Sequence, residues 1–396
     1  MAEKSSNKLI NDSIAEIDLK SLRNNFKIVK KLFLKGSNLK SSSKGKFISS
    51  VVKADAYGHG MCDCAIELAL AGTDFLGTAD YSESLRLTAY LKKHKVNTPV
   101  FCMGTLPIGK ENLQSVAKEN FHFTIVDMED ARKLNSAAVS LNKKLNVQIQ
   151  VDTGMNRVGF PMETAYDALI QIQKLKNLNP VGIYSHFATS EVPKESFAKK
   201  QINSFKDFLK EVEANLFEFK YKHISNTGGV FNYNDDYFNL IRPGISLYGY
   251  YPDEEFYNNK TGLTPVMNFK SRIRFIKKVP KGRSVSYGRR FFTDKDTHIA
   301  SIPVGYGDGY PRSLTNKGKV LINGKEYKIS GTVCMDWIMV DIGAKPKVKI
   351  NDEVILFGPQ YPVYEAANLA GTIPYEITSN ITQRIPRVYI NRTKRK

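Results

Sequence analysis

Eight apolar runs rich in β-branched and aromatic residues recur between about residues 45 and 250, and most are separated by amphipathic segments. In segments such as 83–91 and 198–212, apolar residues recur at helical spacing. A strand–helix–strand series predicts parallel βαβ units, and eight units most often close into a barrel. We therefore predict an α/β fold with a (β/α)8 TIM-type barrel over residues 12–255, whose weakest unit spans 230–237. The eight runs are FISSVVKAD, DFLGTAD, PVFCMG, FHFTIVD, NVQIQVDTG, VGIYSHF, YKHISNTGG and NLIRPGISLYG.

The pattern changes after about residue 262, where apolar runs are short and turns are closely spaced. Asn323-Gly324, between LI and KEYKI, is a strong hairpin signal. We predict a C-terminal, mostly antiparallel β domain over residues 262–396. A leading strand over 13–18, followed by a helix over 20–34, precedes the barrel and could instead pair with this domain. The C-terminal runs are FKSRIRFIKKV, THIASIPVGYG, KVLINGKEYKISGTV and DEVILFG.

Charge and cysteine content narrow the class of protein. The net charge of +19 raises the hypothesis of a nucleic-acid-binding protein, but the lysines and arginines are scattered and the aromatic residues lie mostly inside apolar runs. No apolar run has the length of a membrane span, and the N-terminus lacks the apolar core of a signal peptide. Four cysteines without a matched pair of ligand motifs predict neither a disulfide framework nor a metal site. We expect a cytoplasmic protein without nucleic-acid or membrane partners.

Barrel enzymes hold their active sites at the carboxyl ends of the strands. A lysine near arginines in such a mouth should lose proton affinity, and the free amine suits a Schiff base. Glycine-flanked ends of the late strands leave backbone N–H groups open to a phosphate. Together these features predict pyridoxal 5'-phosphate as cofactor. The polar residues at the predicted strand ends are Lys53, Asp152, Arg157, His186, Asn226, Thr227 and Arg242, with Gly244 and Ile245 beside the last.

The sequence resembles the alanine racemases over nearly its whole length. The motif VVKADAYGHG is highly specific, and the order and spacing of the others support it. The resemblance implies a barrel carrying pyridoxal phosphate, a β domain that completes a homodimer, and an amino-acid substrate. The other motifs are DTGMNRVGF, YSHFATSE, ISNTGG, IRPGISLYG, SVSYG, IPVGYGDGYPR, GTVCMDWIMVDIG and PYEITSNITQRIPR.

The resemblance also implies roles for individual residues. Lys53 would hold the cofactor and act as one base, and Tyr287 of the partner subunit would act as the other from the opposite face of Cα. Arg242 would donate to the pyridine nitrogen, and His186 would connect Arg242 to Tyr287. The substrate carboxylate would meet Arg157 and the backbone N–H of Met335, the latter from the partner. The phosphate would be held by Tyr57, Thr227, Gly244, Ile245 and Tyr375, beside Asn226, and the substrate entrance would be lined by Tyr306 and Arg312.

Two positions bear on the charge and size of the site. Some relatives have a carbamylated lysine where this sequence has Gln150, a neutral amide that cannot neutralise Arg157. Either a bound anion takes over this task, or Arg157 is held more loosely. Val158 follows Arg157, as in alanine-specific members, and the bulky Tyr375 would crowd a longer side chain. A serine racemase, a broad-specificity racemase and a basic-amino-acid decarboxylase of the same barrel remain alternatives, and Arg242 argues against the decarboxylase.

Overall fold

The computed structural model describes residues 11–35, 45–194, 196–216, 218–252 and 261–394. Within these ranges the chain forms two compact units. The barrel unit holds the chain from Ser21 to Ala56 and from Met61 to Leu263. The β unit holds the N-terminal part up to Lys20, the short stretch Tyr57–Gly60 and the chain from Thr264 onward.

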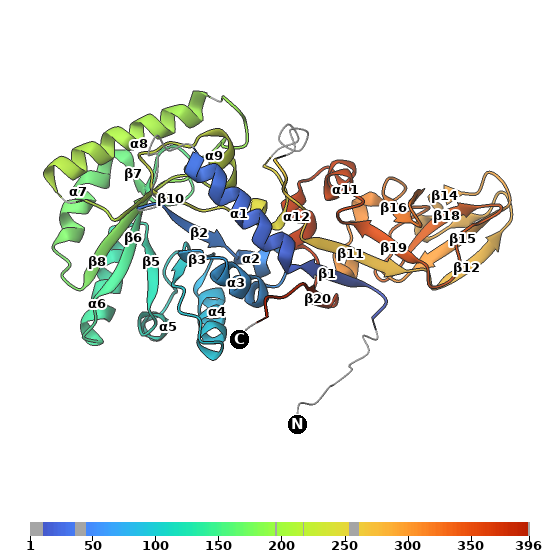
Figure 1. The fold of residues 1–396 in the computed structure, drawn as a ribbon, viewed down its shortest axis with the longest axis horizontal. Helices are drawn as coiled ribbons and strands as arrows, with labels where there is room; N and C mark the ends of the chain where they lie inside the picture. The colour runs from blue at the N-terminus through green and yellow to red at the C-terminus, as the bar shows by residue number, and fades with distance from the viewer. Residues whose placement is uncertain (1–10, 36–44, 195, 217, 253–260, 395–396) are drawn as a thin grey trace. The chain divides into compact units, whose positions relative to one another are not determined.

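The barrel unit is built on a parallel sheet of eight successive strands, which confirms the predicted fold class (Figure 1). The order is β10-β2-β3-β4-β5-β6-β8-β9, and the short β7 (Phe160–Pro161) pairs with β6. Every residue of β3 and β5 is buried, as expected for strands covered on both faces. The strands are β2 (Phe47–Val51), β3 (Phe75–Thr78), β4 (Val100–Cys102), β5 (Phe121–Ile125), β6 (Leu145–Asp152), β8 (Leu178–Tyr184), β9 (Tyr221–His223) and β10 (Leu240–Ile241).

Helices connect these strands and cover the outside of the sheet (Figure 1). Two begin at aspartate caps: the Asp80 carboxylate accepts from the Glu83 N–H, and that of Asp127 accepts from the Asp130 N–H. Such caps satisfy backbone donors that the first helical turn leaves unpaired. The helices of this unit are α1 (Leu19–Lys35, from Ser21 onward), α3 (Met61–Leu70), α4 (Tyr81–Lys93), α5 (Lys110–Ala117), α6 (Met128–Ser140), α7 (Met162–Gln173), α8 (Ser196–Asn215) and α9 (Thr227–Asn232), with a 3-10 turn η1 (Ile245–Tyr248).

Backbone hydrogen bonds join the first and last strands of the path, β10 and β9. The Asn239 N–H donates to the Lys222 carbonyl at 3.0 Å, and the Arg242 N–H donates to the Ser225 carbonyl at 2.8 Å. An aromatic cluster packs the unit around Phe75, with Phe101, Tyr184, Tyr221 and Leu240. These bonds join the two end strands of the path, and the cluster packs side chains from several of its strands together.

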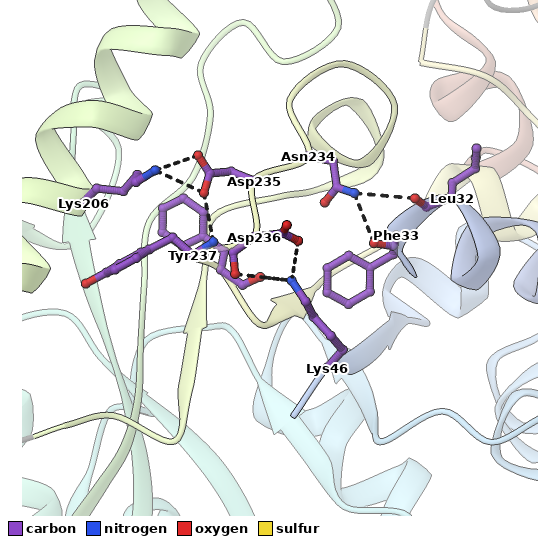
Figure 2. A network of polar contacts seen from close by, with 9 residues as sticks. Leu32, Phe33, Lys46, Lys206, Asn234, Asp235, Asp236 and Tyr237 are labelled. Atoms are coloured by element: carbon purple, nitrogen blue, oxygen red, sulfur yellow. Dashed lines mark hydrogen bonds and ion pairs between the residues drawn. The ribbon is translucent and has the colours of Figure 1, made fainter. Parts of the chain in front are cut away.

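The last βα unit is short, and polar contacts of the loop before β10 compensate for its size. Figure 2 shows Lys206 of α8 against Asp235, at 2.9 Å, and Lys46 against Asp236, at 3.2 Å. In the same view the Asn234 amide donates to the carbonyls of Leu32 and Phe33 near the end of α1. This loop is thus tied to α1, α8 and the residue before β2.

The β unit contains a six-stranded sheet of order β17-β16-β19-β11-β1-β20 and a three-stranded sheet of order β12-β15-β18. Most of its pairs are antiparallel, as predicted, whereas β1 and β20 run parallel. The N-terminal strand β1 lies between β11 and β20. The strands are β1 (Ile14–Asp18), β11 (Met267–Arg272), β12 (Phe275–Val279), β13 (Ser284–Val285), β14 (Phe291–Phe292), β15 (Thr297–Ile302), β16 (Lys319–Ile322), β17 (Lys325–Lys328), β18 (Ile338–Gly343), β19 (Glu353–Phe357) and β20 (Arg387–Ile390).

Local features of this unit match the sequence pattern only in part. The Asn323-Gly324 turn joins β16 and β17 as an antiparallel hairpin, with Ile322 opposite Lys325. The run FKSRIRFIKKV divides into β11 and β12, which belong to different sheets, and the buried Ile273 lies between them. Short helical elements complete the unit: α11 (Val363–Ala370), α12 (Pro374–Ser379), and the 3-10 turns η2 (Tyr287–Arg289), η3 (Tyr306–Asp308) and η4 (Arg312–Leu314).

No helix in the described part of the chain combines the length and apolar character needed to cross a membrane.

Candidate active site

Lys53 follows β2 and opens a left-handed turn, α2 (Lys53–Tyr57). Ala54, Asp55 and Ala56 have φ of 51°, 51° and 57°, and Tyr57 has φ of 53°. Such a conformation costs about 1–2 kcal/mol per non-glycine residue, so other contacts must hold it. The Glu83 carboxylate accepts from the Ala54 N–H at 2.6 Å, and the Asp55 carboxylate accepts from the Met61 N–H at 3.0 Å. These contacts hold the turn and thereby fix the backbone at Lys53, just after the end of β2.

The surroundings of Lys53 favour its neutral amine. Burial lowers the pKa of Lys53 from its usual value, and the positive charges of Arg157 and Arg242 lower it further, while Glu83 acts in the opposite direction. A lysine with a lowered pKa holds more of its amine in the nucleophilic form near neutral pH. The structure therefore brings three of the predicted residues into one electrostatic environment.

Arg242 lies after β10 and is buried. Its guanidinium donates to Nδ1 of His223, to the Ser185 carbonyl at 2.8 Å and to Nδ1 of His186 at 3.2 Å. It also stacks over the Tyr184 ring, 4.9 Å from the ring centroid. Burial lowers the pKa of Arg242 to about 10, which still leaves it cationic at neutral pH. A guanidinium is only a donor, so the imidazole nitrogens that face Arg242 must be unprotonated.

A chain of buried side chains continues from Arg242 into the barrel. Nε2 of His223 lies 2.6 Å from the Gln148 amide oxygen, and the Gln148 amide nitrogen lies 3.3 Å from Nδ1 of His122. Since Nδ1 of His223 accepts from Arg242, its Nε2 carries the proton and donates to Gln148. Burial and Arg242 hold the pKa of His223 well below its usual range. None of His223, Gln148 and His122 is among the predicted site residues. They lie on three strands, β9, β6 and β5, and their only signal in the sequence is a polar side chain inside an apolar run.

His186 follows β8, and the positive charges of Arg242, Arg157 and Lys53 act on its imidazole. Burial first, then Arg242, Arg157 and Lys53, lower the pKa of His186 to about 3. Its Nδ1 faces Arg242 and accepts, so the ring is neutral and its Nε2 carries a proton. His186 can therefore donate one hydrogen bond from Nε2 but does not act as a cation.

Gln150 contacts a tyrosine through its amide oxygen. The Tyr184 hydroxyl donates to that oxygen at 2.9 Å, and both side chains are buried. The loop after β6 is held separately, because the Asp152 carboxylate accepts from the backbone N–H groups of Gly154, Met155 and Arg157. The loop carrying Arg157 is thus fixed through its backbone, and Arg157 itself is exposed.

The ends of β9 and β10 form a group of backbone donors. The Asn226 amide oxygen caps α9 by accepting from the Gly229 N–H, and the Thr227 hydroxyl accepts from the Gly244 N–H at 3.0 Å. Among the described residues, none accepts a hydrogen bond from the N–H groups of Thr227, Gly228 or Ile245, although these residues are buried. Buried donors without acceptors are uncommon, and N–H groups at a helix start suit an anion. These residues fit the phosphate of pyridoxal phosphate.

The remaining predicted residues lie in the β unit. Tyr57 and Tyr375 are neighbours there, with ring centroids 6.0 Å apart. Tyr306 belongs to η3 and Arg312 to η4, and both line one cavity of 480 Å³. This cavity also contains Glu376 and Asn380.

Tyr287 is presented by a strained backbone. Ser286 has φ of 68° and ψ of −176°, a region that residues other than glycine rarely occupy. Two bonds to Thr332 hold it: the Ser286 hydroxyl donates to the Thr332 carbonyl at 2.7 Å, and the Thr332 hydroxyl donates to the Tyr287 carbonyl at 2.6 Å. The Tyr287 side chain is 72% exposed on this chain, and Met335, close in sequence to Thr332, is 51% exposed.

Known proteins share both the sequence and the fold. Residues 17–252 match the family "Alanine racemase, N-terminal domain", and residues 266–389 match "Alanine racemase, C-terminal domain". The alanine racemase of Geobacter sulfurreducens is 39% identical over 387 residues, which cover 96% of this chain and 97% of that protein.

Two solved structures illustrate the likeness in fold. The alanine racemase of Clostridium difficile 630 aligns with a TM-score of 0.87 at 34% identity, covering 97% of each chain. The alanine racemase of Bartonella henselae, solved with covalently bound pyridoxal phosphate, aligns with a TM-score of 0.84 at 30% identity, covering 96% of this chain and 99% of that one. The chain therefore belongs to the alanine racemase family.

Proposed function

We propose that this protein interconverts L-alanine and D-alanine with pyridoxal 5'-phosphate as cofactor. The observation that carries the proposal is the Lys53 amine, whose pKa is lowered by burial and by two arginines, at the carboxyl end of a barrel strand. The buried N–H groups of Thr227 and Ile245 supply a phosphate site on the same barrel unit. Family membership supports the reaction and the cofactor.

The residues have distinct tasks in holding the cofactor. Lys53 would hold it through its amine, and Thr227, Gly244 and Ile245 would hold its phosphate beside Asn226, with Tyr57 and Tyr375 from the β unit. When bound, the cofactor withdraws electrons from the Cα of the amino acid and makes its proton acidic. Arg242 would donate a hydrogen bond to the ring nitrogen. Because Arg242 cannot accept a proton and its imidazole neighbours are neutral, it would leave that nitrogen unprotonated.

Proton transfer uses two bases on opposite faces of Cα. Lys53 holds or removes the proton on one face, and the phenol of Tyr287 from a partner subunit does so on the other. The high exposure of Tyr287 on its own chain supports this assignment. His186 donates from Nε2 to the Tyr287 oxygen and thereby stabilises its anionic form without carrying charge itself. Arg157 would lie beside the cofactor's phenolic oxygen and, with the partner's Met335 N–H, would bind the substrate carboxylate.

This assignment requires a homodimer, because Tyr287 and Met335 act in the site of the partner subunit. Several large apolar side chains of the β unit are exposed on the single chain, and burying them favours association. The Tyr306 and Arg312 side chains then line the entrance to the partner's site. These exposed side chains are Phe275, Tyr287, Phe292, Tyr306, Met335 and Trp337.

Alanine is the substrate that the site residues favour. Val158 follows Arg157, and Tyr375 limits the room for a side chain longer than methyl. A serine or broad-specificity racemase is the alternative, and a chiral assay across alanine, serine and lysine separates them. The free thiols of all four cysteines support action in the reducing cytoplasm, where the product would serve D-alanine biosynthesis.

Replacing Tyr287 by Phe tests the two-base assignment. Enantiomers have equal free energy, so racemisation should fall equally in both directions, by about 10²–10⁴-fold. Exchange of the α-proton with deuterated solvent should persist for the enantiomer whose proton faces Lys53 and be lost for the other. Cofactor loading, read from the yellow absorbance and from borohydride trapping on Lys53, should not change. Tyr166→Phe, on α7, is the matched control, and wild-type racemisation by Tyr287→Phe would contradict the assignment.

A further inference from the structure

Three loops of the β unit meet around the segment that carries Met335. They are the turn 305–309, the segment 332–337 before β18, and the segment 380–385 after α12. The Tyr306 N–H donates to the Cys334 carbonyl at 3.0 Å, and the Gly307 N–H donates to the Met335 carbonyl at 2.9 Å. Thr382 joins the third loop to the first, because its N–H donates to the Asp308 carbonyl at 3.1 Å. The loops therefore share one backbone network.

One arginine ties the side chains of these loops together. The Arg384 guanidinium lies 2.6 Å from the Asp336 carboxylate and 3.4 Å from that of Asp308. The second oxygen of Asp308 accepts from the Gly305 N–H at 3.0 Å. The Asp308 side chain is 8% exposed, whereas those of Arg384 and Asp336 are about half exposed. Arg384 thus links a buried carboxylate of one loop to a carboxylate next to Met335.

The packing leaves little freedom at this junction. A Cβ at Gly307 would lie 2.4 Å from the Arg384 guanidinium and 3.1 Å from the Met335 side chain. The Cys334 carbonyl lies in the same peptide plane as the Met335 N–H, and the hydrogen bond that it accepts from the Tyr306 N–H fixes that plane. The bond from the Gly307 N–H to the Met335 carbonyl fixes the next peptide plane. Among the described residues, none accepts a hydrogen bond from the Met335 N–H. That donor is therefore held in place and left available to a ligand.

We propose that Arg384 is a positioning residue that aims the Met335 N–H, and with it the Tyr306 turn, at the carboxylate of a substrate in the partner's site. The inference rests on the proposed function, which supplies the carboxylate. Arg384 itself touches neither substrate nor cofactor in this role. It acts by holding Asp336, the residue after Met335, against the buried Asp308.

Removing the guanidinium would leave two carboxylates near each other without their shared counter-charge. The pKa of Asp308 is raised, mainly by burial and further by the negative charge of Asp336. The positive charge of Arg384 lowers this pKa and so acts against both. Without Arg384, like-charge repulsion should push the exposed Asp336 toward solvent, and Met335 would move with it. Because Arg384 and Asp336 are half exposed, solvent screening keeps the effect moderate.

The experiment compares Arg384→Ala with Arg384→Lys and with Arg274→Ala in the holoenzyme. Arg274 also pairs with an aspartate of the β unit, Asp12 at 3.1 Å, and is similarly exposed, so it is the matched control. For Arg384→Ala, KM for both enantiomers and Kd for propionate, which is alanine without its amino group, should rise about fivefold. The kcat and the cofactor absorbance should stay within about twofold, and Arg384→Lys should lie between the wild type and Arg384→Ala, because an ammonium lacks the guanidinium fork.

A double variant and an exchange measurement separate positioning from stability. Arg384→Ala with Asp336→Asn should bind propionate more tightly than Arg384→Ala alone, since the repelling charge is gone. Amide hydrogen exchange of the peptide containing Met335 should accelerate in Arg384→Ala and not in Arg274→Ala.

An unchanged Kd for propionate in Arg384→Ala, or an equal loss in Arg274→Ala, would overturn the positioning role while leaving the racemase assignment intact. If Arg384→Ala does not fold, an unchanged Kd in Arg384→Lys overturns it instead. A wild-type protein that binds pyridoxal phosphate but racemises no amino acid would refute the proposed function itself.

Discussion

The Tyr184 hydroxyl donates its hydrogen bond to the amide oxygen of Gln150, 2.9 Å away. The oxygen of Gln150 is therefore engaged by a neutral partner. A neutral amide at position 150 does not offset the positive charge of Arg157, which lowers the pKa of Lys53.

We predict that Gln150→Glu raises the pKa of Lys53. A carboxylate beside Tyr184 would offset the positive potential of Arg157, so the lysine would hold its proton to higher pH. Association of pyridoxal phosphate with the apoenzyme needs the neutral amine, and its rate, followed by absorbance, should shift to higher pH. Gln150→Met, which removes the acceptor without adding charge, should keep the wild-type profile. A shift of equal size in Gln150→Met would rule out the electrostatic explanation.

Stability should fall in mild acid because of His122. Burial first, and then Lys220, lower the pKa of His122 from 6.5 to about 4. Between these values the unfolded chain binds a proton that the folded chain does not, so stability decreases as the pH falls through this window. The difference corresponds to roughly 3 kcal/mol at most. His122→Asn keeps an acceptor for Gln148 but does not titrate there, so urea midpoints at pH 7, 6, 5 and 4.5 should fall less steeply than in the wild type. Parallel curves would contradict the prediction.

Ser286 offers a test of backbone strain. Ser286→Ala loses the bond to Thr332 and keeps the unfavourable φ, whereas Ser286→Gly loses the same bond and relieves the strain. We expect Ser286→Gly to be more stable than Ser286→Ala by about 1–3 kcal/mol, measured by denaturation. The glycine variant should nevertheless have the lower kcat, because it holds Tyr287 less firmly. Equal stabilities would show that the strain is not energetically significant.

The loop before β10 provides a prediction on barrel stability. Asn234→Ala removes the amide that donates to the Leu32 and Phe33 carbonyls, and with it two contacts between the loop and α1. We expect a loss of about 1 kcal/mol in the free energy of unfolding. Asn215→Ala removes an exposed amide that bonds only within its own helix, to the Glu211 carbonyl, and should cost less than about 0.5 kcal/mol. A cost for Asn215→Ala as large as that for Asn234→Ala would contradict the role given to the loop.

The barrel could be predicted because its strands are buried on both faces and therefore read as continuous apolar runs, as β3 and β5 do. The hairpin at Asn323-Gly324 was predictable from local turn chemistry. The division of FKSRIRFIKKV into two strands was not, since Ile273 continues the alternation of apolar and polar residues on either side of it and no glycine or proline marks the break.

The site was predicted unevenly for a similar reason. Lys53, Arg157 and Arg242 follow strands, so a rule about strand ends finds them. His223, Gln148 and His122 lie within strands, and their partnership depends on which strands become neighbours in the closed sheet. Their placement needs three-dimensional information that a single sequence does not carry.

Tyr57–Gly60, directly after the lysine turn, belongs to the β unit, as does the N-terminal strand β1. Gly58 packs so closely on the Thr378 carbonyl that a Cβ there would lie 2.0 Å from it, and Arg387 donates to the Gly58 carbonyl at 3.0 Å. If the gene were divided between codons 263 and 264, both β1 and Tyr57–Gly60 would be encoded with the barrel unit and not with the β unit to which they belong. Neither half can therefore be exchanged by itself between homologues. Recombination should be tolerated only where the residues up to Lys20, the stretch Tyr57–Gly60 and the chain from Thr264 onward come from the same parent.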